Sequence, residues 1–142
     1  MEEKDFIHKY TEMIYNHYKN HKHNEMSNFS KGEGGVLVYI YRKNNVVTPG
    51  ELGEFFGVCS GRIGNVLKDL ESKKCIVRIS DAQDKRKTNV SLTEKGIEIA
   101  KNITHRYVSK IGEIYKILGK NDAEELIRIM NKINDRKGGN DV

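Results

Sequence analysis

Cysteine, proline and tryptophan are scarce in this sequence of 142 residues, which has two Cys, one Pro and no Trp. Two cysteines without a C-x-x-C pair indicate neither a disulfide framework nor a thiolate zinc site. The longest apolar run, VLVYIY at residues 36–41, is far too short to cross a bilayer. The first residues, MEEKDFIHKY, are charged where a signal peptide would be apolar. We therefore expect a cytoplasmic protein without a membrane partner.

Catalytic signatures are missing as well. The stretch KGEGG lacks the G-K-[ST] of a phosphate-binding loop, and neither H-E-x-x-H nor G-x-S-x-G occurs. We therefore expect no enzyme and no cofactor.

The composition favours one helix-rich domain, with 37% apolar and 32% charged residues. The formal net charge is +5, and residues 62–88 hold eight Lys or Arg against four Asp or Glu, which is +4. A local basic patch of this kind favours polyanions, with nucleic acid first and an anionic membrane surface second. Composition alone does not choose between the two.

Apolar residues at helical spacing predict an amphipathic helix over about residues 3–20. A second, buried helix follows, with Ser30 and Glu33 in the register of a capping box. Thr48 is then expected to cap a third helix, with Pro49 at its first position and Gly57 at its end.

After a tight turn, residues 59–72 carry a single apolar stripe on a fourth helix. The helical rotation places a small, polar and basic set of residues on the face opposite this stripe, formed by Gly61, Asn65, Lys68 and Ser72 and flanked by Arg62 and Gly64. The two helices and their turn therefore predict a helix-turn-helix.

The segments CIVRIS and KTNVSL predict two strands that are joined by residues 81–86. Thr93 is expected to cap a long helix, which Gly119 ends, and a last helix follows with its own apolar face. The predicted fold is mostly α with a small β-wing, an α+β winged helix-turn-helix with additional helices at both ends.

The stretch DAQDKRKTNVSLTEKG, residues 81–96, resembles the wing signature of the multiple antibiotic resistance regulator (MarR) family. That signature has an acid, a basic tip with the pattern D-x-R and then V-x-L-T-x-x-G, and Asp84 and Arg86 stand at the D-x-R positions. Residues 48–78 are similar to the family's helix-turn-helix. Cys59 and Lys74 depart from it, because the family commonly has Ser and Gly there.

The resemblance covers roughly residues 30–118 and implies a homodimer that binds double-stranded DNA. We expect one MarR-like domain over 1–142, with a DNA-binding lobe at 30–96 and dimerisation helices at 1–28 and 97–142. The resemblance also implies a repressor on a palindromic operator. A small-molecule effector would act from a cleft between the dimerisation helices and the lobe.

Each part of the lobe would contact DNA differently. The recognition helix would lie in the major groove, where Asn65 can pair with adenine and Arg62 can read guanine or hold phosphate. Arg86 would enter the minor groove, oriented by Asp84. Phosphate contacts are expected from the neighbouring lysines. The complete set of predicted DNA-binding residues is Ser60, Gly61, Arg62, Gly64, Asn65, Lys68, Asp84, Lys85, Arg86 and Lys87.

The apolar faces near both ends of the chain predict the dimer interface, because a monomer of this size would not cover them fully. The expected interface residues of one subunit and its partner are Phe6, Ile7, Tyr10, Met13, Ile14, Ile127, Met130 and Ile133.

Three alternatives remain open. His17, His21 and His23 have chemistry suited to zinc or nickel, although they also fit a solvated helix end, so we assign no metal. Cys59 at a helix start is compatible with redox sensing, and equally with a small turn residue. A winged helix that binds only protein is the third alternative, and salt-sensitive binding to duplex DNA would exclude it.

Overall fold

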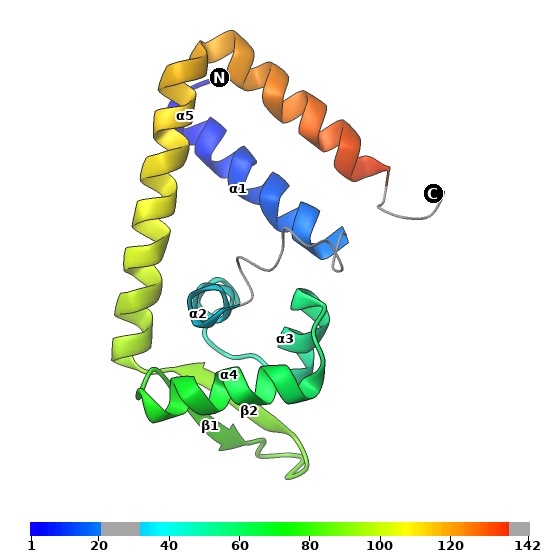
Figure 1. Ribbon diagram of the computed structural model, residues 1–142, viewed down its shortest axis with the longest axis vertical. Helices are drawn as coiled ribbons and strands as arrows, with labels where there is room; N and C mark the ends of the chain where they lie inside the picture. The colour runs from blue at the N-terminus through cyan, green and yellow to red at the C-terminus, as the bar shows by residue number, and fades with distance from the viewer. Residues whose placement is uncertain (21–31, 137–142) are drawn as a thin grey trace. The chain divides into compact units, whose positions relative to one another are not determined.

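The computed structural model describes residues 1–20 and 32–136 of the chain, and Figure 1 shows its elements. In chain order these are α1 (Glu3–Asn20), α2 (Glu33–Arg42), α3 (Pro49–Phe56), α4 (Ser60–Ser72), β1 (Ile76–Ser80), β2 (Thr88–Leu92) and α5 (Glu94–Asp135). The chain divides into two compact units. We call Lys22–Thr104 the winged lobe, and Met1–His21 with His105–Val142 the helical unit.

The helical unit is held together by the apolar face of α1 and the later part of α5. Phe6 is fully buried in a cluster with Ile111, Ala123 and Ile127. Its ring also packs against Tyr115, with 5.4 Å between the ring centroids. Phe6, Met13 and Ile127, which the sequence placed in the dimer interface, are therefore buried within this one chain.

Polar contacts continue this packing towards the end of α5. Asn134 is buried, and its Nδ2 donates to the backbone oxygen of Met13 at 3.0 Å. Its Oδ1 lies 3.3 Å from Nδ1 of His17. Met13 is itself only 2% exposed. The side chain of Asn134 therefore joins two turns of α1 to α5.

Helix α5 is interrupted at Gly119, whose φ of 77° and ψ of 170° are not helical. Glycine adopts a positive φ without the steric cost that a Cβ would add. The sequence predicted that the long helix would end at this residue, and the interruption confirms it. Among the described residues, no helix has both the length and the apolar character that a bilayer span requires.

The winged lobe packs its helices against one face of an antiparallel sheet of two strands. Ile76 pairs with Leu92 and Arg78 with Val90, and the side chains of these two pairs lie on one face of the sheet. Val77 lies on the opposite face. The helices contribute further core residues, which are Val36, Leu37, Tyr39, Ile40, Leu52, Phe56, Ile63, Leu67, Leu70 and Ala100.

A short third segment extends this sheet and was not predicted. Val47 pairs with Val90 through two backbone hydrogen bonds of 3.1 and 2.7 Å. Just before it, the Oδ1 of Asn45 accepts from the backbone N–H of Leu92 at 2.8 Å. The connection between α2 and α3 is therefore fixed to β2.

Helix α2 has Gly32 as its N-cap residue, without a side-chain cap hydrogen bond. The predicted capping box pairs Glu33 with Ser30, which lies outside the described residues. Glu33 forms an ion pair with Lys73, with 2.7 Å between Oε2 and Nζ. The hydrogen bond from Lys73 to this carboxylate raises the pKa of Lys73. The start of α2 is thereby joined to the end of α4.

An aromatic group joins α2 to the first helix of the helix-turn-helix. Tyr39 donates its hydroxyl to Oε2 of Glu51 at 2.9 Å. Its ring lies 4.5 Å from Phe55 and 5.9 Å from Phe56 between centroids. Tyr39 is 7% exposed, so this hydrogen bond satisfies a nearly buried phenol.

The first turn of α5 forms a close joint with the turn that follows α4. The oxygen of Cys75 accepts from the N–H of Thr93 at 3.0 Å, and the hydroxyl of Thr93 donates to the oxygen of Lys74 at 2.6 Å. The same hydroxyl accepts from the N–H of Gly96, which confirms Thr93 as the helix cap. Lys95 donates to the oxygen of Lys73 at 2.9 Å. Three successive carbonyls are thus satisfied by one helical turn.

This joint leaves no room for a side chain at Gly96. A Cβ there would lie 2.1 Å from the backbone oxygen of Cys75, which cannot rotate away as the end of a side chain could. The final glycine of the V-x-L-T-x-x-G pattern is therefore required by backbone contact.

Gly96→Ala should lower the free energy of unfolding by about 3 kcal/mol, because the joint must open to admit the methyl group. Urea denaturation measures it. Gly50→Ala is the matched control, because a Cβ at Gly50 meets nothing within 4 Å. Equal unfolding free energies for the two variants would contradict the proposed contact.

Candidate nucleic-acid interface

The helix-turn-helix is built by local signals that the sequence contains. Thr48 caps α3, with its Oγ1 accepting from the N–H of Glu51 at 3.1 Å, and Pro49 occupies the first helical position. Gly57 ends the helix in the left-handed region, with φ at 66°. These predictions are confirmed, and the resulting turn sets the direction in which α4 begins.

Helix α4 buries the predicted stripe and exposes the predicted polar face. Ile63, Leu67 and Leu70 are buried. All the residues predicted to contact DNA from this helix face solvent or are half-buried, namely Ser60, Gly61, Arg62, Gly64, Asn65 and Lys68. Within the described residues, Arg62, Asn65 and Lys68 have no side-chain hydrogen bond or ion pair. Their polar groups are therefore available to a ligand.

The N-terminus of α4 has no side-chain cap. Cys59 occupies the N-cap position without forming a cap hydrogen bond, and the first turn contains no acidic residue. The departure from Ser that the sequence showed thus leaves the first amides of α4 without an acceptor from this residue. Uncapped amides at a helix start favour an anion.

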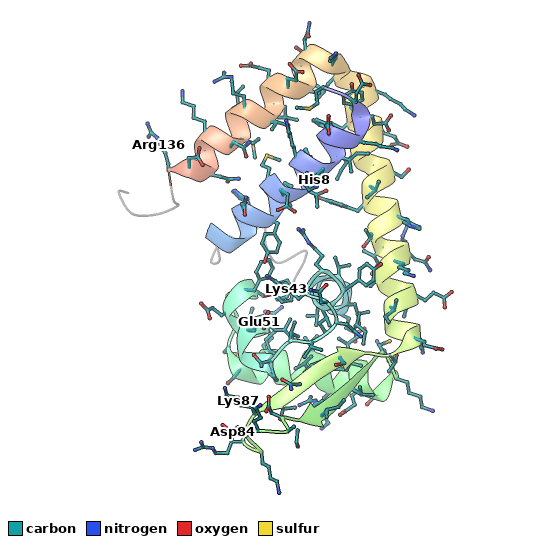
Figure 2. All side chains as sticks on the ribbon, turned by 180° about the vertical axis from the view of Figure 1, so that it is seen from behind. His8, Lys43, Glu51, Asp84, Lys87 and Arg136 are labelled. Carbon is teal, nitrogen blue, oxygen red and sulfur yellow. The ribbon has the colours of Figure 1, made fainter. Side chains whose placement is uncertain are left out.

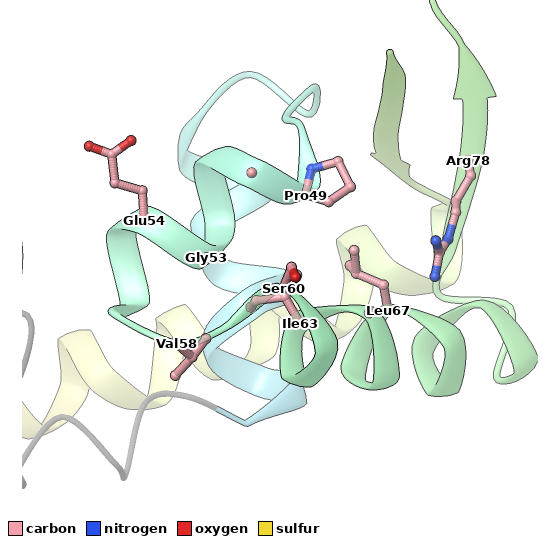
Figure 3. A pocket seen from close by; sticks show the side chains of 10 residues that line it. Pro49, Gly53, Glu54, Val58, Ser60, Ile63, Leu67 and Arg78 are labelled. Carbon is pink, nitrogen blue, oxygen red and sulfur yellow. The ribbon is translucent and has the colours of Figure 1, made fainter. Parts of the chain in front are cut away.

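A pocket of about 300 Å³ lies between α3 and α4 and is closed at one side by Arg78 from β1 (Figure 3). Ile63 and Leu67 give it an apolar lining, and Ser60 and Gly64 border it. Arg78 was not among the predicted site residues, and its Nε lies 3.8 Å from Oε1 of Glu71. Strand alternation places Arg78 on the same face of β1 as the apolar Ile76, so the sequence pattern indicated that it faces the helices.

The turn after α4 is stabilised by two hydrogen bonds. The N–H of Lys74 donates to the oxygen of Glu71, and the N–H of Cys75 donates to the oxygen of Leu70. The N–H groups of Gly57 and Val58 form the same pattern after α3, and there the residue in the left-handed conformation is a glycine, Gly57. In the turn after α4 the equivalent residue is Lys74, which adopts the left-handed conformation with φ at 62°.

The wing loop is closed by backbone hydrogen bonds within residues 81–87. The N–H of Asp81 donates to the oxygen of Lys87 at 2.9 Å, and the N–H of Lys87 donates to the oxygen of Asp84 at 3.0 Å. The predicted strands are confirmed to within one residue at each end. The wing tip and the start of α4 lie towards the same end of the lobe (Figure 1).

The wing tip carries its basic side chains outward (Figure 2). The side chain of Arg86 is 92% exposed, and its Nε lies 3.2 Å from Oδ1 of Asp84. The same oxygen accepts from the N–H of Arg86 at 3.0 Å. Asp84 therefore orients Arg86 in the free protein, and Lys85 and Lys87 are exposed on either side.

Of the histidines considered as metal ligands, only His17 lies within the described residues, and it forms a hydrogen bond with Asn134. His21 and His23 lie outside them. Across residues 1–20 and 32–136, no three His, Cys, Asp or Glu side chains come together as metal ligands. Cys59 is an exposed free thiol and Cys75 a buried one.

A helix-turn-helix followed by a two-stranded wing and a long helix defines a winged helix-turn-helix fold. The family model described as MarR family matches residues 28–87, which include α2, both helices of the helix-turn-helix and the wing loop. This part of the chain is therefore similar to the MarR family.

Individual proteins show the same similarity. The HTH-type transcriptional regulator MhqR of Bacillus subtilis (strain 168) is 27% identical over 112 residues, which are 79% of this chain and 77% of MhqR. The S. aureus MepR–DNA complex superimposes with a TM-score of 0.60 at 25% identity, over 73% of this chain and 76% of MepR. A mutant of MarR from E. coli gives a TM-score of 0.56 at 27% identity, over 68% of this chain and 72% of that protein.

Lys74→Gly should raise the free energy of unfolding by up to about 1 kcal/mol, because glycine removes the Cβ penalty of the left-handed region. Thermal or urea denaturation measures the gain. Lys74→Ala is the control, since it removes the same side chain and charge but keeps the Cβ. A gain of equal size in both variants would show that the strain lies elsewhere.

Proposed function

We propose that this protein binds double-stranded operator DNA as a homodimer and represses transcription under the control of a small-molecule effector. The proposal depends on one observation, which is that the winged lobe exposes two polar surfaces. One surface is the exposed face of α4, with Arg62, Asn65 and Lys68, and the other is the wing tip with Arg86. The effector part rests on the family resemblance.

Each surface suits a different part of duplex DNA. The face of α4 combines side chains that hydrogen-bond base edges with two glycines, Gly61 and Gly64, where a Cβ would meet nothing within 4 Å in the free protein. A DNA backbone approaching these positions closely would explain why the helix keeps them, since each costs about 1 kcal/mol relative to Ala. Arg86 on a narrow loop suits the negative potential of a minor groove.

The similarity to S. aureus MepR supports DNA as the ligand, because that protein was solved as a complex with DNA. The remaining predicted contacts, Ser60, Asp84, Lys85 and Lys87, belong to the same two surfaces. Lys85, Lys87 and Lys68 would hold phosphates and contribute affinity without sequence information.

The helical unit supports the dimer. Although Phe6 and Ile127 are covered within the chain, α5 still exposes large apolar side chains: Ile117 is 83%, Ile129 43% and Ile133 48% exposed. Ile129 and Ile133 stand one helical turn apart, and contiguous exposed apolar side chains mark an interaction surface. A second copy of the chain would cover them in a symmetric interface, to which Ile7, Tyr10, Ile14 and Met130 would also contribute.

Arg86→Ala should weaken operator binding by on the order of 1 to 3 kcal/mol while the fold is kept, because it removes the predicted minor-groove contact. Fluorescence anisotropy with duplex DNA from immediately upstream of the gene measures the change.

Lys68→Ala is the comparison for this variant. It should weaken specific and non-specific DNA alike and reduce the slope of log affinity against log salt by about 1, as expected for one lost phosphate contact. Unchanged affinity for folded Arg86→Ala, or a loss at a single base position for Lys68→Ala, would overturn the respective assignment.

The operator should be an inverted repeat with half-site centres about 10 base pairs apart, because a two-fold dimer places two recognition helices roughly 34 Å apart. Footprinting on the upstream DNA tests the spacing, and sedimentation tests the dimer. A stable monomer, or protection of one unrepeated half-site, would exclude the arrangement.

A further inference from the structure

Asp81 is the residue through which the wing loop is attached to the end of β1. Its Oδ1 accepts from the N–H of Gln83 at 2.8 Å and from the N–H of Asp84 at 3.2 Å. Its Oδ2 accepts from Nδ2 of Asn89, on β2, at 3.4 Å. Both oxygens of one carboxylate are therefore engaged, one by the loop and the other by the opposite strand.

These contacts continue in sequence towards the wing tip. Asp81 holds the backbone of Asp84, and Asp84 in turn accepts from both the backbone and the side chain of Arg86. The hydrogen bonds from the Gln83 and Asp84 amides, followed by that from Asn89, hold the pKa of Asp81 below its ordinary value. The carboxylate is thus ionised at neutral pH, and hydrogen bonds to an ionised acceptor are stronger than neutral ones.

We propose that Asp81 is a positioning residue of the wing, whose carboxylate holds the loop in the conformation in which Asp84 directs Arg86 towards DNA. This inference deepens the proposed function and rests on it. Ordering a loop costs conformational entropy for every residue that is fixed. If Asp81 orders the loop in the free protein, DNA binding does not bear that cost.

Charge alone predicts the opposite effect. Asp81 lies beside Lys85, Arg86 and Lys87 in sequence, and a carboxylate next to a polyanion weakens attraction. Removing the carboxylate would therefore tighten DNA binding if Asp81 were only a surface charge. A positioning residue must do the reverse, so the sign of the change separates the two roles.

The test uses the full chain and duplex DNA from immediately upstream of the gene. Asp81→Ala should weaken binding about tenfold, because the loop must then be ordered on binding. Asp81→Asn keeps an oxygen that can accept from both amides, so it should bind at least as tightly as the natural protein. Glu98→Ala is the charge control, because Glu98 is an exposed acid on α5 with no hydrogen bond or ion pair within the described residues. It should leave affinity unchanged or slightly raised.

A second readout is independent of DNA. In the free protein, the amides of Gln83 and Asp84 should exchange with solvent faster in Asp81→Ala and at the natural rate in Glu98→Ala, as measured by NMR. Unchanged exchange in Asp81→Ala, or affinity equal to or tighter than that of the natural protein, would overturn the proposal.

Arg86→Ala in the same titration distinguishes this inference from the function it rests on. If Arg86→Ala loses affinity and Asp81→Ala does not, only the positioning role is overturned. If neither variant loses affinity, the wing does not contact DNA, and the positioning role fails with that part of the proposed function. Loss in both, with recovery in Asp81→Asn, supports both.

Discussion

The winged lobe depends on the backbone contact between Gly96 and the carbonyl of Cys75. The recognition helix ends, the wing begins and α5 starts within a few residues of this point, and Thr93 and Lys95 satisfy the carbonyls of the same turn. These hydrogen bonds and the absence of a Cβ at Gly96 together hold the first turn of α5 against the turn that follows α4. The orientation of α4 relative to the wing is set here, before any DNA is bound.

Much of the fold could be predicted because its signals are local. Thr48, Pro49 and Gly57 define α3 through capping chemistry, and the apolar period of α4 assigned its faces correctly. Tertiary contacts were out of reach of such reasoning. Nothing in the sequence around Val47 distinguishes an extended linker from a segment paired with Val90, and nothing around Glu33 indicates its ion pair with Lys73.

The candidate interface follows the same division. The charge of the wing and the polar face of α4 are visible in the sequence, because side-chain type and helical period determine them. The hydrogen bonds that hold the wing loop are not visible in the sequence, because Asp81 and Asn89 are eight residues apart and meet only once the strands are paired. In the helical unit, an apolar face indicates that something must cover it, but periodicity does not distinguish this chain from a second copy. Phe6 is the residue for which that ambiguity mattered.

The connection between α2 and α3 has a mechanical consequence. Tyr39 on α2 holds Glu51 of the helix-turn-helix, while Asn45 and Val47, which follow α2, hold β2 of the wing. Helix α2 and the connection that follows it therefore contact both the helix-turn-helix and the wing, the two parts that we propose bind DNA. A displacement of α2 would carry the recognition helix and the wing together as one body. Under the proposed function, a signal that reaches α2 would therefore act on both DNA-binding surfaces at once.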